Sequence, residues 1–170
     1  MDFMELAAKR YSVRKFSGEK VSREHVEQIL KAAHLAPTGC NNQPQRIYVL
    51  ESEEALQKLK ECTPYHFHAP LTFVLCYDRG RSWKRSYDGA DSGPVDTSIV
   101  GTHMILEACT LGVGSTWVMM FDPAKLREAF SVPEELDIVA LLPMGYPAEN
   151  ARPSRLHSQF IPFEDMTEFI

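Results

Sequence analysis

An Arg-x-Ser-x-Arg spacing near the start of the chain could bind a phosphate group. Arg10, Ser12 and Arg14 alternate with Tyr11 and Val13, and alternate residues of an extended segment point to the same side. Two guanidinium groups and a hydroxyl on one side suit charge-assisted, bidentate hydrogen bonds to phosphate oxygens. A solvated basic patch at the end of a helix is the alternative interpretation, and the spacing alone does not decide between the two.

Side-chain amides are concentrated in a second segment, residues 36–46, which reads A-P-T-G-C-N-N-Q-P-Q-R. An amide both donates and accepts hydrogen bonds, so such a segment can bind the edge of a heterocycle. Proline, glycine and asparagine are also the usual residues of a plain turn. Both interpretations stay open at this point.

Two further segments carry weaker signals. The Gly-x-Gly at residues 112–114 follows a predicted helix and precedes a predicted strand, which is the reverse of the order in a dinucleotide-binding fold, so that fold is excluded. Near the end of the chain, Arg152 and Arg155 are the only Lys or Arg residues after Glu134. Isolated bases in an acidic segment indicate a defined anionic target, with a surface salt bridge as the alternative.

Metal and thiol chemistry have less support. Cys62, His66 and His68 lie within seven residues, but no fourth ligand stands at a spacing familiar from structural zinc sites. Cys40 would need a neighbouring base and an oxyanion donor to act as a nucleophile. The four cysteines include no C-x-x-C pair, which is typical of free thiols in a reducing cytoplasm.

Predicted helices and strands alternate along the chain, and they must position these residues. A strand over residues 71–77 is apolar on both faces and is therefore expected at the centre of a sheet. The helix that Ser22 opens must end before Pro37. Hydrophobic periodicity and caps predict the remaining elements: helices over 2–10, 22–36, 53–61, 94–111 and 123–130, and strands over 46–50, 71–77, 115–121 and 138–144, with a polar loop at 78–94.

Two apolar features predict that part of the chain packs against a surface outside the single domain. The helix over 94–111 is apolar nearly all round, with Asp96, His103 and Glu107 as its only ionisable residues, and such a helix must be covered on all sides. A second subunit is a natural source of that cover. The segment after residue 145 is either a disordered tail or an arm packed on another surface. Its large apolar residues favour the arm: Phe160, Ile161, Phe163, Phe169 and Ile170.

Composition sets the class of protein. A length of 170 residues with 44% hydrophobic and 24% charged residues is typical of one globular domain. A net charge of −5 argues against a general nucleic-acid binder. No apolar run reaches the ~20 residues of a membrane span, and the N-terminus lacks the pattern of a signal peptide. We therefore expect a cytoplasmic single-domain protein.

In their order along the chain, these segments resemble the FMN-dependent nitroreductase family. The family's R-x-S-x-R is matched by Arg10, Ser12 and Arg14. Its A-P-S-x-x-N-x-Q-P signature appears as Ala36, Pro37, Thr38, Asn41, Gln43 and Pro44. Its L-G-x-G followed by a W-x-x-x-F-D-P strand matches Leu111–Pro123, and its late G-Y-P and basic residue match 145–147 and Arg155. The resemblance spans roughly residues 3 to 155.

The resemblance implies an α+β fold with a central, mostly antiparallel sheet flanked by helices. It implies one domain over residues 1–170 and an intertwined homodimer, with residues 146–170 as an arm exchanged between subunits. FMN would be held tightly but non-covalently at the subunit interface. The cofactor-binding residues would be Arg10, Tyr11, Ser12, Arg14, Pro37, Thr38, Gly39, Asn41, Gln43, Trp117, Val118, Met119, Met120 and Arg155.

The implied activity is NAD(P)H-driven, ping-pong hydride transfer through flavin N5 to a nitroaromatic, a quinone or an activated alkene. A backbone N–H near Met119 would face N5, and no side chain or metal would act in catalysis. The chain departs from the family in Gln45, where an aromatic residue is common, and in the short loop at 78–94, which replaces a lid. The substrate pocket would be lined by Cys40, Tyr65, His66 and Trp83.

Two other functions stay open from the sequence. A flavin-binding redox sensor or flavin carrier without significant turnover would use the same cradle. A thiol or metal enzyme would use Cys40, or the Cys62, His66 and His68 cluster, in place of a flavin.

Overall fold

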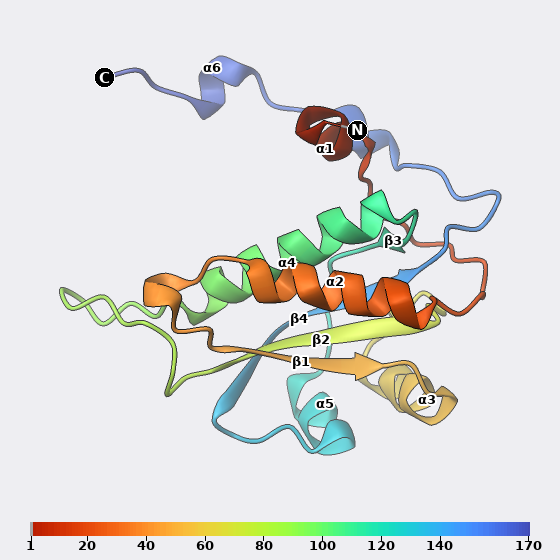
Figure 1. Ribbon diagram of the computed structural model, residues 1–170, viewed down its shortest axis with the longest axis horizontal. Helices are drawn as coiled ribbons and strands as arrows, with labels where there is room; N and C mark the ends of the chain where they lie inside the picture. The colour runs from red at the N-terminus through yellow and green to blue at the C-terminus, as the bar shows by residue number, and fades with distance from the viewer. Residues whose placement is uncertain (1) are drawn as a thin grey trace.

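Four antiparallel strands form the centre of the computed structural model, which describes residues 2–170, and helices cover both faces of the sheet (Figure 1). The elements in chain order are α1 (Phe3–Lys9), α2 (Arg23–Leu35), η1 (Gly39–Asn41), β1 (Gln45–Leu50), α3 (Glu53–Cys62), β2 (Leu71–Asp78), α4 (Gly93–Thr110), β3 (Gly114–Ser115), α5 (Pro123–Phe130), β4 (Leu136–Gly145), η2 (Arg155–Ser158) and α6 (Phe163–Met166). The α+β class and the mostly antiparallel sheet predicted from the sequence are confirmed.

The strands run in the order β1-β2-β4-β3. Val74 of β2 pairs with Tyr48 of β1 on one side and with Leu141 of β4 on the other. Residues 71–77 are buried on both faces of the sheet, which confirms the prediction of a central strand. A strand can be apolar on both faces only where helices cover both of them.

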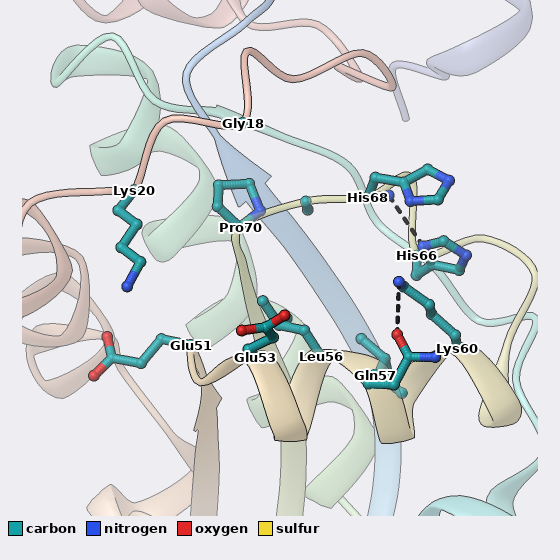
Figure 2. A pocket seen from close by; sticks show the side chains of 12 residues that line it. Gly18, Lys20, Glu51, Glu53, Leu56, Gln57, Lys60, His66, His68 and Pro70 are labelled. Atoms are coloured by element: carbon teal, nitrogen blue, oxygen red, sulfur yellow. Dashed lines mark hydrogen bonds between the residues drawn. The ribbon is translucent and has the colours of Figure 1, made fainter.

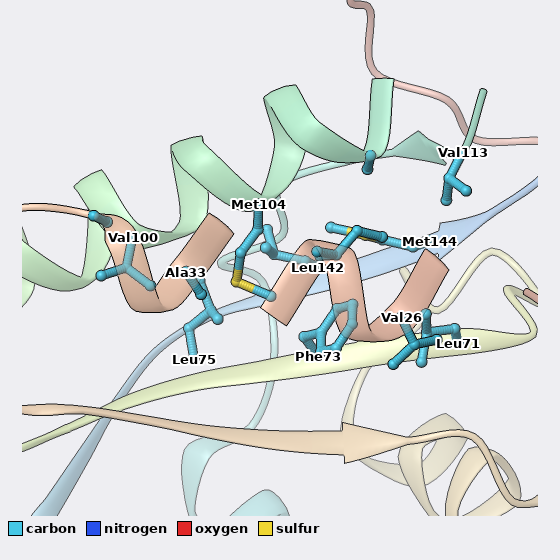
Figure 3. Close-up of a cluster of buried hydrophobic side chains, with 13 residues drawn as sticks. Val26, Ala33, Leu71, Phe73, Leu75, Val100, Met104, Val113, Leu142 and Met144 are labelled. Atoms are coloured by element: carbon cyan, nitrogen blue, oxygen red, sulfur yellow. The ribbon is translucent and has the colours of Figure 1, made fainter. Parts of the chain in front are cut away.

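Two helices cover each face. On one face α2 and α4 pack on β2 and β4, as Figure 3 shows for Val26, Ala33, Val100 and Met104 above Phe73. On the other face α3 and α5 enclose a second cluster that includes Leu59, Leu126 and Leu141. The start of α2 is fixed by Ser22, whose Oγ accepts the His25 N–H at 3.2 Å, as is usual for a helix cap.

The strand predicted over 115–121 is wrong for most of its length. β3 contains only Gly114 and Ser115, and the chain then touches β4 again at a single bridge between Val118 and Leu141. The Thr116 N–H donates to the Pro143 carbonyl at 3.2 Å, but Pro143 has no N–H to return the bond. The ladder therefore breaks, and Met119 and Met120 lie outside the sheet.

One side of α4 is uncovered in the single chain. Its inner side includes Val100, Met104 and Ala108, which are fully buried. Its outer side carries an apolar groove lined by Pro94, Val95, Ser98, Ile99, Thr102 and His103. The prediction that the helix is covered on all sides is thus not met within one protomer.

The segment after β4 leaves the body of the domain and passes α1 (Figure 1). His157 Nε2 lies 3.1 Å from the Ala8 carbonyl, so η2 is attached to α1. Phe160 and Phe169 beyond it are 85% and 93% exposed, which leaves the exchange of an arm between subunits a prediction. Within residues 2–170, no helix combines the length and apolar character of a membrane span.

We expect Gly101→Ala to destabilise the protein. A Cβ at this position of α4 would lie 2.5 Å from the Trp117 ring and 2.7 Å from Leu75, so both side chains would have to move. Overpacking of this kind costs about 1–3 kcal/mol of unfolding free energy, measurable by urea denaturation. Lys31→Ala, on the exposed side of α2, is the control and should change the unfolding free energy little. Equal stability of the two variants would contradict the packing described for Gly101.

Candidate functional site

The Arg10–Arg14 segment runs along the short strand β3. Ser12 forms a parallel bridge with Ser115, and the Val13 N–H donates to the Ser115 carbonyl at 2.9 Å. Val13 is 2% exposed and fills the space beside Gly114, where a Cβ would lie 2.6 Å from it. Because Val13 faces inward, its neighbours Ser12 and Arg14 face the other side. Arg14 is exposed there.

This basic segment lies at the C-terminal end of α4. A small cavity of 120 Å³ is lined by Arg10, Tyr11 and Ser115 together with Cys109 and Gly112 from the end of that helix. Arg155 begins η2, which is attached to the same region because His157 contacts Tyr11 with 6.2 Å between ring centroids. The structure thus brings the segment of Arg155 beside the segment of Arg10, although they are far apart in the sequence.

The segment after β3 crosses α4 and then becomes exposed. The Trp117 ring packs on Gly101 in the middle of α4, and the Val118 side chain is buried toward α3 and α5. Met119 and Met120 are 69% and 66% exposed. Within residues 2–170 no hydrogen bond involves the Met119 N–H, so that donor is free for a ligand.

A turn after α3 is attached to this exposed segment. Thr63 Oγ1 donates to the Met120 carbonyl at 2.6 Å and accepts the Tyr65 N–H at 3.0 Å. Thr63 is buried, so it acts as a fixed link between the two stretches of chain. Tyr65 is therefore held near Met120.

His66 lines a separate cavity of 360 Å³ between α3 and the loop that contains Gly18 and Lys20 (Figure 2). The His68 N–H donates to His66 Nδ1 at 3.0 Å. The pKa of His66 is lowered by burial, and further by the charges of His68 and Lys60. His66 is therefore a neutral ring at pH 7.

The amide-rich segment lies at the opposite end of α4, where the buried carboxylate of Asp96 holds it. Asp96 Oδ1 accepts the Gly39 N–H at 2.9 Å, and Oδ2 accepts the Ser92 hydroxyl at 2.7 Å. Thr38 Oγ1 accepts the Gln43 N–H at 3.0 Å. We call residues 37–43 the amide loop. From the sequence, Asp96 was identified only as one of three ionisable residues on an apolar helix, and an acid in the first turn of such a helix was the available signal.

Three residues of the amide loop have left-handed backbone conformations. The φ angles of Cys40, Asn41 and Gln43 are 51°, 56° and 50°, and none of these residues is glycine. Each such residue costs of the order of 1–3 kcal/mol, and strain of this kind is concentrated at ligand sites. Asn41 is exposed, so its amide is presented to solvent by a loop whose backbone is fixed.

The loop before α4 packs against the amide loop. A Cβ at position 39 would lie 3.1 Å from the Trp83 Cβ and 3.2 Å from the Ser92 hydroxyl, so the two loops are in close contact at Gly39. Cys40 and Trp83 therefore lie at this end of α4, whereas Tyr65 and His66 lie on the other half. The four predicted pocket residues do not form one pocket within a single chain.

The predicted cofactor residues also fall into two groups. The clamp half-site is the Arg10–Arg14 segment at the C-terminal end of α4, and the amide half-site is residues 37–43 at its N-terminal end. The 18 residues of α4 separate them, which at 1.5 Å per residue is about 27 Å. Residues 117–120 begin at Trp117, which packs on Gly101 between these two ends. The predicted cofactor residues of one protomer therefore do not come together at a single place in the fold.

Two of the four cysteines are buried. Burial raises the pKa of Cys76 to about 12 and also raises that of Cys62, so both stay protonated. All four cysteines are free thiols. Among residues 2–170, no three His, Cys, Asp or Glu side chains are arranged to hold a metal ion.

Comparisons with known proteins agree with this architecture. The Nitroreductase family model matches residues 7–63 and 64–146. A nitroreductase family protein of Clostridium difficile 630 has a TM-score of 0.94 and 39% identity, with 99% of this chain and 98% of that chain covered. A Methanothermobacter thermautotrophicus protein provisionally named NADH dehydrogenase/NAD(P)H nitroreductase is 30% identical over 92% of this chain and 86% of its own length.

A third similar protein carries a cofactor in its name. The FMN-dependent nitroreductase of Clostridium difficile R20291 has a TM-score of 0.80 and 25% identity, and the alignment covers 98% of each chain. The match to the family model covers most of the chain and includes both half-sites. The chain is a member of the nitroreductase family and an oxidoreductase.

Proposed function

We propose that the protein is an FMN-dependent oxidoreductase that takes hydride from NAD(P)H and reduces an electron-poor acceptor such as a nitroaromatic, a quinone or an activated alkene. The observation that carries the proposal is the pair of half-sites at the two ends of α4, joined by an uncovered apolar helix face. The names of similar proteins, which include NAD(P)H and FMN, support the choice of cofactor and donor.

The residues present fit FMN. A phosphate monoester carries about −2 charges at neutral pH, and the clamp half-site offers Arg10 and Arg14, with Arg155 on the neighbouring segment. The amide loop offers the exposed Asn41 side chain for the edge of a heterocycle. Near Met119, a backbone N–H without a partner in residues 2–170 is available to a ring nitrogen.

A two-fold dimer would join the half-sites. If the uncovered faces of two α4 helices pack antiparallel, the N-terminal end of each lies beside the C-terminal end of the other. The amide loop of one protomer would then meet the clamp half-site of its partner, twice per dimer. The groove around Val95 and Ile99 would be buried in the same step, and residues 146–170 would pack on the partner as an exchanged arm.

In this dimer the side chains of the protein bind and orient FMN, and none of them reacts. FMN, when bound, supplies the hydride-transfer chemistry. The arginines hold the phosphate, the strained amide loop fixes the heterocycle, and the apolar interface excludes water. Cys40 and Trp83 of one protomer would line the acceptor pocket with Tyr65 and His66 of the other. No side chain is required as an acid or base.

We expect Arg14→Ala to bind FMN about 10- to 100-fold more weakly, since a hydrogen bond to a charged group contributes ~1.5–3 kcal/mol. Flavin content per chain after purification and the Kd for FMN are the measurements. Lys15→Ala is the matched control, because it removes an adjacent exposed cation from the opposite side of the segment. Full flavin content in both Arg14→Ala and Arg155→Ala would contradict the proposal that these arginines bind the FMN phosphate.

Subunit mixing tests whether each site is shared. Arg14→Ala and Asn41→Ala homodimers should each be poor in flavin, because every site contains one altered half. In a randomly mixed population, half of the dimers are mixed and each has one intact site, so about a quarter of all sites should recover flavin. No recovery after verified exchange of subunits would place both residues in the site of one chain.

Turnover separates an enzyme from a sensor or carrier. NADH or NADPH should bleach the flavin absorbance under anaerobic conditions, and a quinone should restore it. Initial rates with both substrates varied should give the parallel lines of a ping-pong mechanism. Bound flavin that neither nucleotide reduces would identify a carrier, and intersecting lines would exclude the ping-pong order.

A further inference from the structure

A hairpin over residues 82–92 forms one packed unit with the amide loop. The Ser92 N–H donates to the Trp83 carbonyl and the Arg85 N–H to the Ala90 carbonyl, both at 2.9 Å. The base of the hairpin packs on Gly39 through Trp83. Its position relative to the amide half-site is therefore fixed.

Two ion pairs lie within the hairpin. Lys84 pairs with Asp91 at its base, and Arg85 pairs with Asp88 at 2.6 Å near its turn. Burial alone would raise the pKa of Asp91, but hydrogen bonds from Lys84, Ser82 and the Gly93 N–H lower it to about 2. The pair at the base therefore stays ionised at neutral pH.

One cation of this segment is not neutralised. Residues 78–92 contain four basic side chains, and Arg79 pairs with Asp137 in addition to the two pairs above. Arg81 forms no ion pair within residues 2–170, and its guanidinium makes a single, long hydrogen bond of 3.4 Å to the Asn42 carbonyl of the amide loop. An exposed guanidinium is therefore held at the edge of that loop.

The hairpin also presents aromatic rings to solvent. Tyr87 at the turn is 95% exposed and Trp83 is 39% exposed. A ring that packs on nothing in its own chain, on a hairpin held by ion pairs, offers a flat surface on which a planar base can stack.

We propose that this hairpin binds the adenosine 2′-phosphate end of NADPH, with Arg81 on the phosphate and Tyr87 against the adenine. The inference rests on the proposed function, because it concerns the hydride donor of the same site. The planar guanidinium matches phosphate oxygens bidentately. NADH has no 2′-phosphate, so the hairpin makes the enzyme selective for NADPH.

Another pair of lysines fits a phosphate less well. Lys60 and Lys125 line a hollow of 600 Å³ beside Met120. Glu61 and Asp122 line the same hollow, so its formal charges cancel. We prefer the hairpin because Arg81 at its base forms no ion pair within residues 2–170 and Tyr87 offers an exposed ring at its turn.

The test uses the flavin-loaded protein and two probes, adenosine 2′,5′-bisphosphate and 5′-AMP, which lacks the 2′-phosphate. Calorimetry should show tighter binding of the bisphosphate to the wild type. Arg81→Ala should weaken bisphosphate binding about tenfold or more, as expected for a lost charged hydrogen bond, and leave 5′-AMP unchanged. Tyr87→Ala should weaken both. Arg46→Ala, which removes an exposed arginine from β1, should change neither.

Two outcomes overturn the proposal: equal affinity of the wild type for both probes, or bisphosphate binding that Arg81→Ala leaves intact. Steady-state rates add an independent readout, because Arg81→Ala should lower kcat/KM for NADPH by a similar factor and spare NADH. An equal loss with both donors contradicts recognition of the 2′-phosphate. Binding of the two nucleotide probes does not depend on hydride transfer. If neither donor reduces the flavin, the proposed function fails, while the calorimetry still decides the role of the hairpin.

Discussion

Burial of the inner side of α4 against β2 and β4 determines where every candidate site residue lies. Val100 and Met104 anchor the helix in the core, and Gly93 and Gly101 let it approach Tyr77, Leu75 and Trp117 more closely than any side chain would allow. Because this packing fixes the position of α4 on the sheet, the length of the helix sets the separation of the two half-sites. The outer face of the helix runs from one half-site to the other.

Hydrogen bonds within the chain hold the amide loop in its strained conformation. Three non-glycine residues in left-handed conformations would relax in a free loop. Here the loop is held at Gly39 by Asp96 and between Thr38 and Gln43 by a second hydrogen bond. The buried Asp96 carboxylate has both oxygens hydrogen-bonded, and its bond to Gly39 helps to offset the cost of the loop conformation.

The sequence predicted most elements because their signals are local. Caps such as Ser22 and the apolar run of β2 depend only on neighbouring residues. The strand over 115–121 failed because its partner, Pro143, lies in a distant segment and lacks an N–H. The residue types of both half-sites were visible, but their separation was not, since it depends on which end of α4 each segment meets. Arg81 was not singled out, and Asp96 was noted only as an ionisable residue of an apolar helix, for the same reason: their partners lie 39 and 57 residues away.

The interruption of hydrogen bonding to β4 at Pro143 affects how the sequence of residues 116–121 can evolve. Residues 116–121 are joined to β4 only through Thr116 and Val118, so substitutions at Met119 and Met120 would leave the sheet and its cores intact. The exposed stretch at Met119 and Met120 is thereby uncoupled from the strands that keep the domain folded. Its side chains can vary one residue at a time with little risk to folding.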